Sequence, residues 1–312
     1  MPEFSTQYSI REIVELKDFI TVAYIIIDDI YQEVTPTYIK ERRNIKDSML
    51  SDSEIITIGI VGELLTIDSE KAWHSFCSKN LRDLFPNMCS RTRFNRTRRH
   101  LDKVIELIRN EITKRLGFSD NPHRVVDSMP IPVCHFGRAK FYRSLREHAS
   151  YGYCASKKET YYGFKLHFMI TLEGYITDFT VTAANIDDRE ALWDLVSKYH
   201  SLTILGDKGY LNKDFATDLK LEKNIDLVPI KRNNSKDQYP KPFRQLIFRL
   251  RRMIETVGSQ LSCQLNIQKV LAKSKLGFTA RIKTKILAHN LCCFVNKALG
   301  RDISRIKELV FG

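Results

Sequence analysis

Three acidic residues in this 312-residue chain have the side chains and positions needed to bind metal ions together. Asp127 in VVDSMP and Asp207 in TILGDKGY each lie on or just after a short apolar run that predicts a strand. Glu255 in RLRRMIETV lies in a long helical pattern. A carboxylate in an apolar strand is strongly destabilising unless it is paired or binds a metal. We therefore interpret the three residues as one metal site, against the alternative of three unrelated surface acids.

The donor atoms of this site indicate which metal it binds. Carboxylate oxygens suit Mg²⁺, with Mn²⁺ as a plausible substitute, and no Cys or His cluster has the spacing of a zinc site. Two such ions about 4 Å apart can activate a hydroxyl and stabilise the leaving oxygen in phosphodiester transfer. We expect two ions per site, with Asp127 bridging both and Asp207 and Glu255 each completing one.

The distribution of charge indicates a polyanionic partner. The net charge is +13, and residues 1–90 hold 9 Lys and Arg against 15 Asp and Glu. Residues 91–120 hold 9 against 4, and residues 121–312 hold 32 against 18. Basic side chains that neutralise phosphates release counterions, which favours nucleic acid as the partner, and the alternative is a charge that serves solubility alone. No apolar run approaches a membrane span and no signal peptide is evident, so we expect a cytoplasmic protein with no membrane partner.

A cluster of Gly, Ser, Asp, Asn and Pro at residues 117–123 separates two sequence patterns. Residues 1–118 predict an all-helical N-terminal domain, in which Ser51–Glu54 forms a capping box before an apolar helix. Residues 91–112 predict one helix whose first turns carry five arginines: Arg91, Arg93, Arg96, Arg98 and Arg99. This basic start suits phosphate contact or a helix-turn-helix, and a solvated face of a helical bundle explains it equally well.

Residues 119–312 predict an α/β domain with a mixed five-stranded sheet, flanking helices and C-terminal helices. Three leading strands suit antiparallel pairing, and two later strands joined through helices must be parallel. Pro130 and Pro132 cannot both donate to a central ladder, so the first strand should stop soon after Asp127 or lose a hydrogen bond. The last helix of this series is amphipathic, and Glu255 flanks its apolar face, which comprises Phe243, Leu246, Ile247, Leu250, Ile254, Val257 and Leu261.

These motifs, in this order, resemble bacterial insertion-sequence transposases of the DDE class, whose catalytic domain has an RNase H-like fold. The resemblance covers nearly the whole chain. It rests on LSDSEIIT, VVDSMPIPV, YYGFKLHFMIT, TAANIDDREAL, LGDKGY, the RxxxE of Arg251 to Glu255, and RIKTKILAHNLC. Some relatives have, at the positions of Phe248 and Ser262, a Tyr and a Lys that bind the DNA end. In this chain Gln260, Lys269 or Lys208 are alternatives for that role.

The resemblance implies a transposase that cuts DNA at insertion-sequence ends and transfers the freed 3′-OH into target DNA. Asp127, Asp207 and Glu255 would be its catalytic and metal-binding residues. It implies terminal-repeat and target DNA as partners, a homodimer in the DNA complex, and association with the nucleoid when bound to DNA. The N-terminal domain would bind DNA ends, mediate dimerisation, or both. Two alternatives stay open: a catalytically inactive DNA-binding or regulatory derivative, and a metal-dependent nuclease of the same fold without strand transfer.

Basic residues in three parts of the chain are candidates for DNA contact. The stretch between the first two strands also carries aromatic residues that could stack on an exposed base, and it could equally be a loop that folds only on DNA. The candidates are Arg251, Arg252 and Lys208 near the carboxylates, Arg138, Lys140, Arg143, Lys157 and Lys158 in the linking stretch, and Arg96, Arg98 and Arg99 in the N-terminal domain.

Other polar residues near these motifs receive structural interpretations. Asp187 and Asp188 precede a predicted helix, and we interpret them as its caps rather than as metal ligands. His167 and His289 lie in apolar runs and are interpreted as core histidines.

Overall fold

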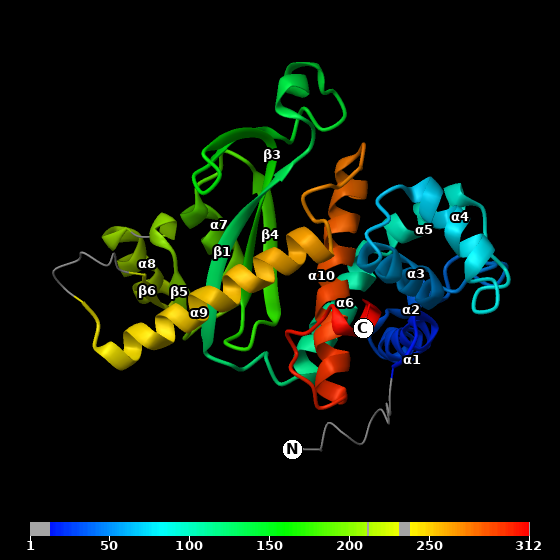
Figure 1. The fold of residues 1–312 in the computed structure, drawn as a ribbon, viewed down its shortest axis with the longest axis horizontal. Coiled ribbons are helices and arrows are strands. Elements are labelled where there is room, and N and C mark those ends of the chain that lie inside the picture. The colour runs from blue at the N-terminus through cyan, green and yellow to red at the C-terminus, as the bar shows by residue number, and fades with distance from the viewer. Residues whose placement is uncertain (1–12, 211, 231–237, 312) are drawn as a thin grey trace. The chain divides into compact units, whose positions relative to one another are not determined.

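The computed structural model describes residues 13–210, 212–230 and 238–311, and gives only the backbone of Lys208, Pro229, Val310 and Phe311. The chain divides into two compact units. The first combines residues 1–116 with residues 261–312, and the second comprises residues 117–260. The second unit occupies the green and yellow part of the colour scale in Figure 1.

The first unit is built from helices around a buried central helix. In that helix, α3, every residue except Glu54 is buried, and the predicted capping box of Ser51 and Glu54 is confirmed at its start. A helix buried on all sides is apolar all round, which the sequence of α3 shows. The helices of this unit are α1 (Leu16–Val34), α2 (Thr37–Lys40), α3 (Asp52–Leu64), α4 (Glu70–Asn80), α5 (Arg91–His100), α6 (Asp102–Arg115), α10 (Lys275–Ala298) and α11 (Glu308–Phe311).

The predicted single helix over residues 91–112 is two helices in the structure. Leu101 ends α5 and begins α6, with a ψ angle of 8° that interrupts the helical path. Its side chain is buried, so the break places an apolar anchor in the core and turns the basic α5 away from the line of α6.

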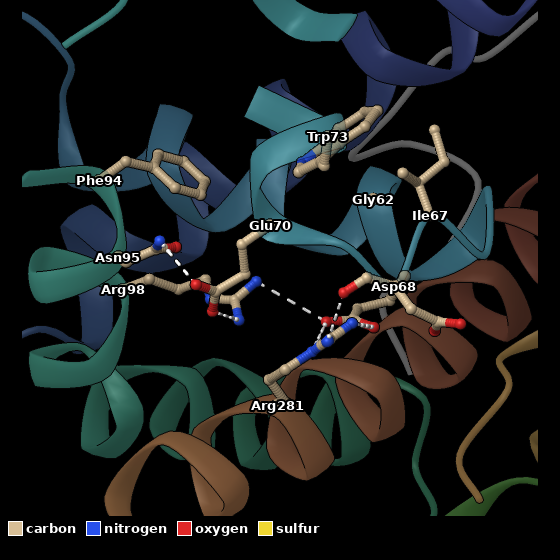
Figure 2. Close-up of a pocket in the computed structure, with 10 residues that line it drawn as sticks. Gly62, Ile67, Asp68, Glu70, Trp73, Phe94, Asn95, Arg98 and Arg281 are labelled. Carbon is tan, nitrogen blue, oxygen red and sulfur yellow. Dashed lines mark hydrogen bonds and ion pairs between the residues drawn. The ribbon is translucent and has the colours of Figure 1, made fainter. Parts of the chain in front are cut away.

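Helix α10 belongs to the first unit, where it packs against α3 and α6. The predicted boundary near residue 118 lies close to the observed division, but the predicted grouping of the C-terminal helices with the catalytic domain does not match it. The reason is a buried ionic cluster around Glu63 of α3. Arg281 donates to both Glu63 oxygens at 2.9 and 2.8 Å and to the Asp68 carbonyl at 2.9 Å (Figure 2).

Two more cations complete this cluster. Lys285 lies 2.5 Å from Glu63. Arg98 lies 3.7 Å from both Glu63 and Glu70 (Figure 2). Burial alone would raise the pKa of Glu63, but Lys285, Arg281 and Arg98 lower it to about 2. The hollow beside the cluster has room for about 10 Å³, which is no larger than one water, so its role is structural.

The second unit contains a six-stranded mixed sheet. Apart from β2, the strand order is β4-β3-β1-β5-β6, in which β4, β3 and β1 are antiparallel and β1, β5 and β6 are parallel. The predicted mixed sheet and RNase H-like order are therefore confirmed. The strands are β1 (His123–Pro132), β2 (Ser150–Cys154), β3 (Glu159–Ile170), β4 (Ile176–Ala183), β5 (Thr203–Gly206) and β6 (Asp226–Pro229).

The sheet differs from the predicted one in its strand number and in the length of β1. Strand β2, which the prediction left in a linking stretch, pairs with residues 159–163 of β3. Strand β1 continues through Pro130 to Pro132, beyond the predicted end. Its pairing with β5 ends at Val126, so the prolines lie where β1 has β3 as its only ladder partner among the described strands. Proline is tolerated at such an edge.

Helices cover both faces of this sheet. On one face α7 and α8 close a core in which Val126 and Met169 contact Leu192 and Phe215. The neighbours of those two strand residues, Asp127 and Phe168, point to the opposite face because side chains alternate along a strand. Helix α9 runs across β1 on that opposite face (Figure 1). The helices and short turns of the unit are η2 (Phe136–Phe141), α7 (Asp188–Leu195), η3 (Lys208–Tyr210), α8 (Lys213–Lys223) and α9 (Lys241–Ser259), followed by the π-turn η4 (Gln260–Gln264).

Candidate active site

Asp127 lies in the middle of β1, on the face that α9 covers. It pairs with Phe168 of β3, and its Oδ1 accepts a hydrogen bond from the backbone N–H of Ser128 at 2.7 Å. Burial raises the pKa of Asp127 to about 6 against the effect of that hydrogen bond. The carboxylates of Asp207, Asp188 and Glu255 raise it further. These three acids therefore lie within electrostatic reach of Asp127.

Asp207 follows the last residue of β5. Gly206 pairs with Val126, so the parallel register brings Asp207 next to Asp127, at the point where the pairing of β1 with β5 ends. Its carbonyl accepts from the backbone N–H of Tyr210 at 3.1 Å, which closes the η3 turn. The Asp207 side chain is exposed.

Glu255 lies on the exposed flank of α9, as the helical spacing predicts. The buried face of α9 comprises Ile247, Leu250, Ile254 and Val257, whereas Phe243 and Leu246, which were predicted to share it, are exposed. Arg251 Nε donates to Glu255 Oε1 at 2.9 Å, one helical turn away. The pKa of Arg251 is raised mainly by this bond and also by Asp207 and Asp127. Arg251 therefore lies beside all three predicted carboxylates.

The three carboxylates share one neighbourhood without forming a closed metal cage. Among the described residues, no three His, Cys, Asp or Glu side chains are grouped tightly enough to hold an ion. The donor set nevertheless fits a divalent cation, because the site supplies carboxylate oxygens and no thiolate, and because burial and the neighbouring acids both raise the pKa of Asp127. The residues that could hold Mg²⁺ are Asp127, Asp207 and Glu255.

Asp187 and Asp188 have different roles, although the prediction treated both as caps. Asp187 is the cap of α7, and its Oδ1 accepts from the backbone N–H of Arg189 at 2.9 Å. Asp188 turns toward the sheet, where it accepts from Lys165 at 3.0 Å and from Ser128 at 3.3 Å. The sequence analysis missed Lys165 and Ser128, although both stand in its motifs YYGFKLHFMIT and VVDSMPIPV.

His167 and His289 are fully buried, so the prediction of core histidines is confirmed. His167 Nε2 lies 3.0 Å from the Thr182 hydroxyl, and burial lowers the pKa of His167 to about 4. Burial likewise lowers the pKa of His289 to about 4. Both rings are therefore neutral at physiological pH.

The predicted DNA-contacting residues of the second unit lie on its surface. Arg251 and Arg252 are exposed on α9, and the side chain of Lys208 lies outside the described part of the structure. The linking stretch is folded as η2 and β2 rather than as an unpaired loop. Its exposed aromatics include Phe141 and Tyr153, and its exposed cations include Arg138, Lys140, Arg143, Lys157 and Lys158.

The predicted arginines of the first unit do not form one surface. Arg98 is buried and pairs with Glu63 and Glu70, so it is withdrawn as a DNA contact. Arg99 is half-buried, and its Nε donates to the Asn95 carbonyl at 3.2 Å. Arg96 is exposed and lines an open hollow of about 330 Å³ together with Arg42, Arg43 and Arg93. The sequence analysis missed Arg42 and Arg43, because they lie about 50 residues away along the chain.

The described parts of the second unit define an RNase H-like domain with one acid within β1, one just after β5 and one on the covering helix. A family model described as "Transposase DDE domain" matches residues 120–274, which include β1, β5 and α9. The chain therefore carries a DDE transposase domain, a class of domain that acts on DNA with divalent metal ions. The comparison with curated proteins found no match, and neither did the comparison with solved structures. No helix among the described residues is long and apolar enough to cross a membrane.

Proposed function

We propose that this transposase cuts DNA at the ends of an insertion sequence and joins the freed 3′-OH to target DNA in the same site. The observation that carries the proposal is the electrostatic grouping of Asp207 and Glu255 around Asp127 within a domain of the DDE family. A single acidic neighbourhood can serve both reactions, because each replaces one bridging oxygen at a phosphorus atom by another hydroxyl.

In this proposal Asp127, Asp207 and Glu255 hold two Mg²⁺ ions, for which Mn²⁺ can substitute. Bound ions of this kind supply Lewis-acid stabilisation of the phosphate and an activated hydroxyl. The described residues supply the rest: β1 and the end of β5 fix two carboxylates, and α9 brings the third. Arg251 and Arg252, exposed beside Glu255, would bind phosphates that flank the scissile bond.

Two further basic surfaces, one in each unit, would contact DNA. In the second unit, the cations of η2 and the β2–β3 hairpin would contact the backbone, and Phe141 or Tyr153 would stack on an exposed base. In the first unit, the hollow of Arg42, Arg43, Arg93 and Arg96 would receive a backbone phosphate. Arg43, Arg93 and Arg96 suit this role, because none has a side-chain ion pair with another described residue, whereas Arg42 is held by Asp52.

Joining requires two DNA ends, so the active form proposed is a homodimer on DNA, with the N-terminal helical domain binding ends, mediating dimerisation, or both. Its place of action is the cytoplasm, on the nucleoid. These features follow from the reaction: the two ends of one element must be held together before either is joined.

Incubation of the purified chain with labelled element-end DNA, unlabelled target DNA and Mg²⁺ tests the function class. The proposal predicts cut ends together with products in which the label is covalently joined to target. Cut ends alone, over the full time course, would support the nuclease alternative. Binding of the DNA without any cut product would support the inactive DNA-binding derivative.

A further inference from the structure

Asp188 lies at the junction of three elements, two of which carry the proposed metal-binding aspartates. It is the first residue of α7, and its side chain is only 23% exposed. Hydrogen bonds tie it to β1 and β3, and its Oδ2 lies close to Gly209 in the turn that follows Asp207. A carboxylate in such a place restrains the elements it touches relative to one another.

We propose that Asp188 is a positioning residue that fixes the turn carrying Asp207 against the strand carrying Asp127. This inference rests on the proposed function, since it concerns the geometry of the same site. Asp188 itself would not bind the metal ions or the DNA.

The first set of contacts anchors Asp188 to the sheet. Its Oδ1 accepts from Lys165 Nζ of β3 at 3.0 Å and from Ser128 Oγ of β1 at 3.3 Å. Lys165 also donates to the Ile186 carbonyl at 3.0 Å, so the ammonium group holds the start of α7 at two points. Charge-assisted bonds of this kind are stronger than neutral ones, and here they lie largely away from solvent.

The second contact reaches the turn after β5. A Cβ atom at Gly209 would lie 2.9 Å from Asp188 Oδ2, which is too close for any residue other than glycine without a shift. Gly209 lies two residues after Asp207, in η3. The neighbouring Tyr210 is buried in the core of α7 and α8. The turn is therefore anchored by its buried tyrosine and passes close to the Asp188 carboxylate.

Asp188 contacts one face of the sheet, and the proposed metal ligand Asp127 points to the other face. Ser128 points toward α7, whereas Asp127, the preceding residue, points toward α9 and Glu255. Oδ1 of Asp188 is already used by two donors. Asp188 therefore acts through β1 and the Asp207 turn rather than by coordination.

The test combines Asp188→Ala, Asp188→Asn, Gly209→Ala and the double variant Asp188→Ala/Gly209→Ala. Asp194→Asn, an exposed acid on the same helix, is the matched control. Each full-length protein is tested for thermal unfolding, for Mn²⁺ affinity by electron paramagnetic resonance, and for kcat and KM on element-end DNA with Mg²⁺. Asp188→Asn keeps an oxygen that can accept hydrogen bonds from Ser128 and Lys165 but removes the negative charge. It therefore distinguishes the effect of the hydrogen bonds from the effect of the charge.

Asp188→Ala and Gly209→Ala are each expected to weaken Mn²⁺ binding and to lower kcat by about 10–100-fold, the usual effect of disturbing a residue that orients metal ligands. KM for DNA should stay unchanged. Asp188→Asn should restore part of the loss. The double variant should be no worse than Asp188→Ala alone, because the clash at position 209 needs the carboxylate.

Wild-type Mn²⁺ affinity and kcat in folded Asp188→Ala would overturn the inference. The inference would also be overturned if the fold-loss of kcat and Mn²⁺ affinity in the double variant equalled the product of the fold-losses in the two single variants. If the wild type binds Mn²⁺ but never cleaves DNA, the proposed function fails. The inference about Asp188 is then still tested by the Mn²⁺ affinities of the two single variants and the double variant. A wild type that does not bind Mn²⁺ at all would overturn both.

Discussion

Arg251 donates to Glu255 across one turn of α9, at a distance of 2.9 Å, on a part of the helix that also feels the charges of Asp127 and Asp207. One guanidinium thus partly neutralises the acidic site that would otherwise bind a divalent cation. Both side chains are about half exposed, so solvent screens the pair and its strength is modest. In the proposed site, Arg251 and a metal ion would compete for the same Glu255 oxygen.

Arg251→Gln should therefore separate metal binding from DNA binding. Without DNA, Mn²⁺ affinity should rise by about twofold, because an exposed pair of this spacing is worth only a few tenths of a kcal/mol. Affinity for DNA should fall, since the neutral side chain no longer attracts a phosphate. Titration with Mn²⁺ followed by electron paramagnetic resonance, and fluorescence anisotropy with labelled DNA, measure the two effects. Arg244→Gln, an exposed arginine two turns earlier on α9, is the control for Mn²⁺ affinity, and an equal rise there would contradict the competition.

Glu63→Gln should destabilise the first unit by about 3–5 kcal/mol, because it leaves Arg281, Lys285 and Arg98 in a buried site without their shared counter-charge. Urea unfolding followed by circular dichroism gives the change in free energy. Asp83→Asn, which removes an exposed ion pair with Lys17, is the matched control and should shift the midpoint far less. Equal changes in the free energy of unfolding for the two substitutions would show that the buried cluster contributes no more to stability than an exposed ion pair.

The same cluster predicts a pH dependence of stability. The pKa of Glu63 is lowered to about 2 in the folded chain, whereas an unfolded glutamate titrates near about 4.3. A carboxylate whose pKa is lower in the folded state stabilises the fold at pH values above its unfolded-state pKa. This stabilisation is lost as the pH falls toward the folded-state pKa. The stability difference between wild type and Glu63→Gln should therefore narrow from about pH 4.5 downward. Urea midpoints of both proteins between pH 7 and pH 3 measure it, and a constant difference would refute the assignment.

The arginine hollow of the first unit should contribute to DNA affinity without contributing to catalysis. Arg93→Ala/Arg96→Ala is expected to weaken DNA binding and to reduce the slope of log K against log salt by up to about 0.9 for each phosphate that is no longer neutralised. Anisotropy titrations at several salt concentrations give the slope. Arg82→Ala, an exposed arginine of the same unit outside the hollow, should leave the slope unchanged. An unchanged slope in the double variant would show that the hollow does not contact DNA phosphates.

Arg98→Ala should behave in the opposite way. Arg98 is buried beside Glu63 and Glu70, so its loss should lower the urea midpoint and leave the salt dependence of DNA binding as in the wild type. This contrast also shows the limit of the sequence analysis, which grouped Arg96 and Arg98 because they share one basic helix start. Helical spacing separates their faces, but only the position of Glu63 decides that one guanidinium is buried.

Local patterns were enough to predict five of the six described strands and to single out the three carboxylates of the proposed site, because an acid at the end of an apolar run is unusual whatever surrounds it. The sequence analysis did not resolve features that depend on distant partners. Strand β2 is short and half exposed, with no apolar alternation of its own, and it exists by pairing with β3. Helix α10 joins the first unit through Arg281 and Lys285, which bind an acid more than 200 residues earlier. Asp188 looks like its neighbour Asp187 in sequence, and only the fold turns it toward Ser128.

The central claim is that Asp127, Asp207 and Glu255 form the catalytic metal site, and cleavage of labelled element-end DNA by Asp127→Ala, Asp207→Ala and Glu255→Ala tests it most directly. Asp218→Ala and Glu222→Ala, exposed acids on α8, are the controls, and thermal unfolding confirms that each protein is folded. The proposal predicts that each triad variant loses cleavage by at least about a thousandfold while both controls keep it. Full cleavage by any one folded triad variant would contradict the assignment of that residue and require another acid in its place.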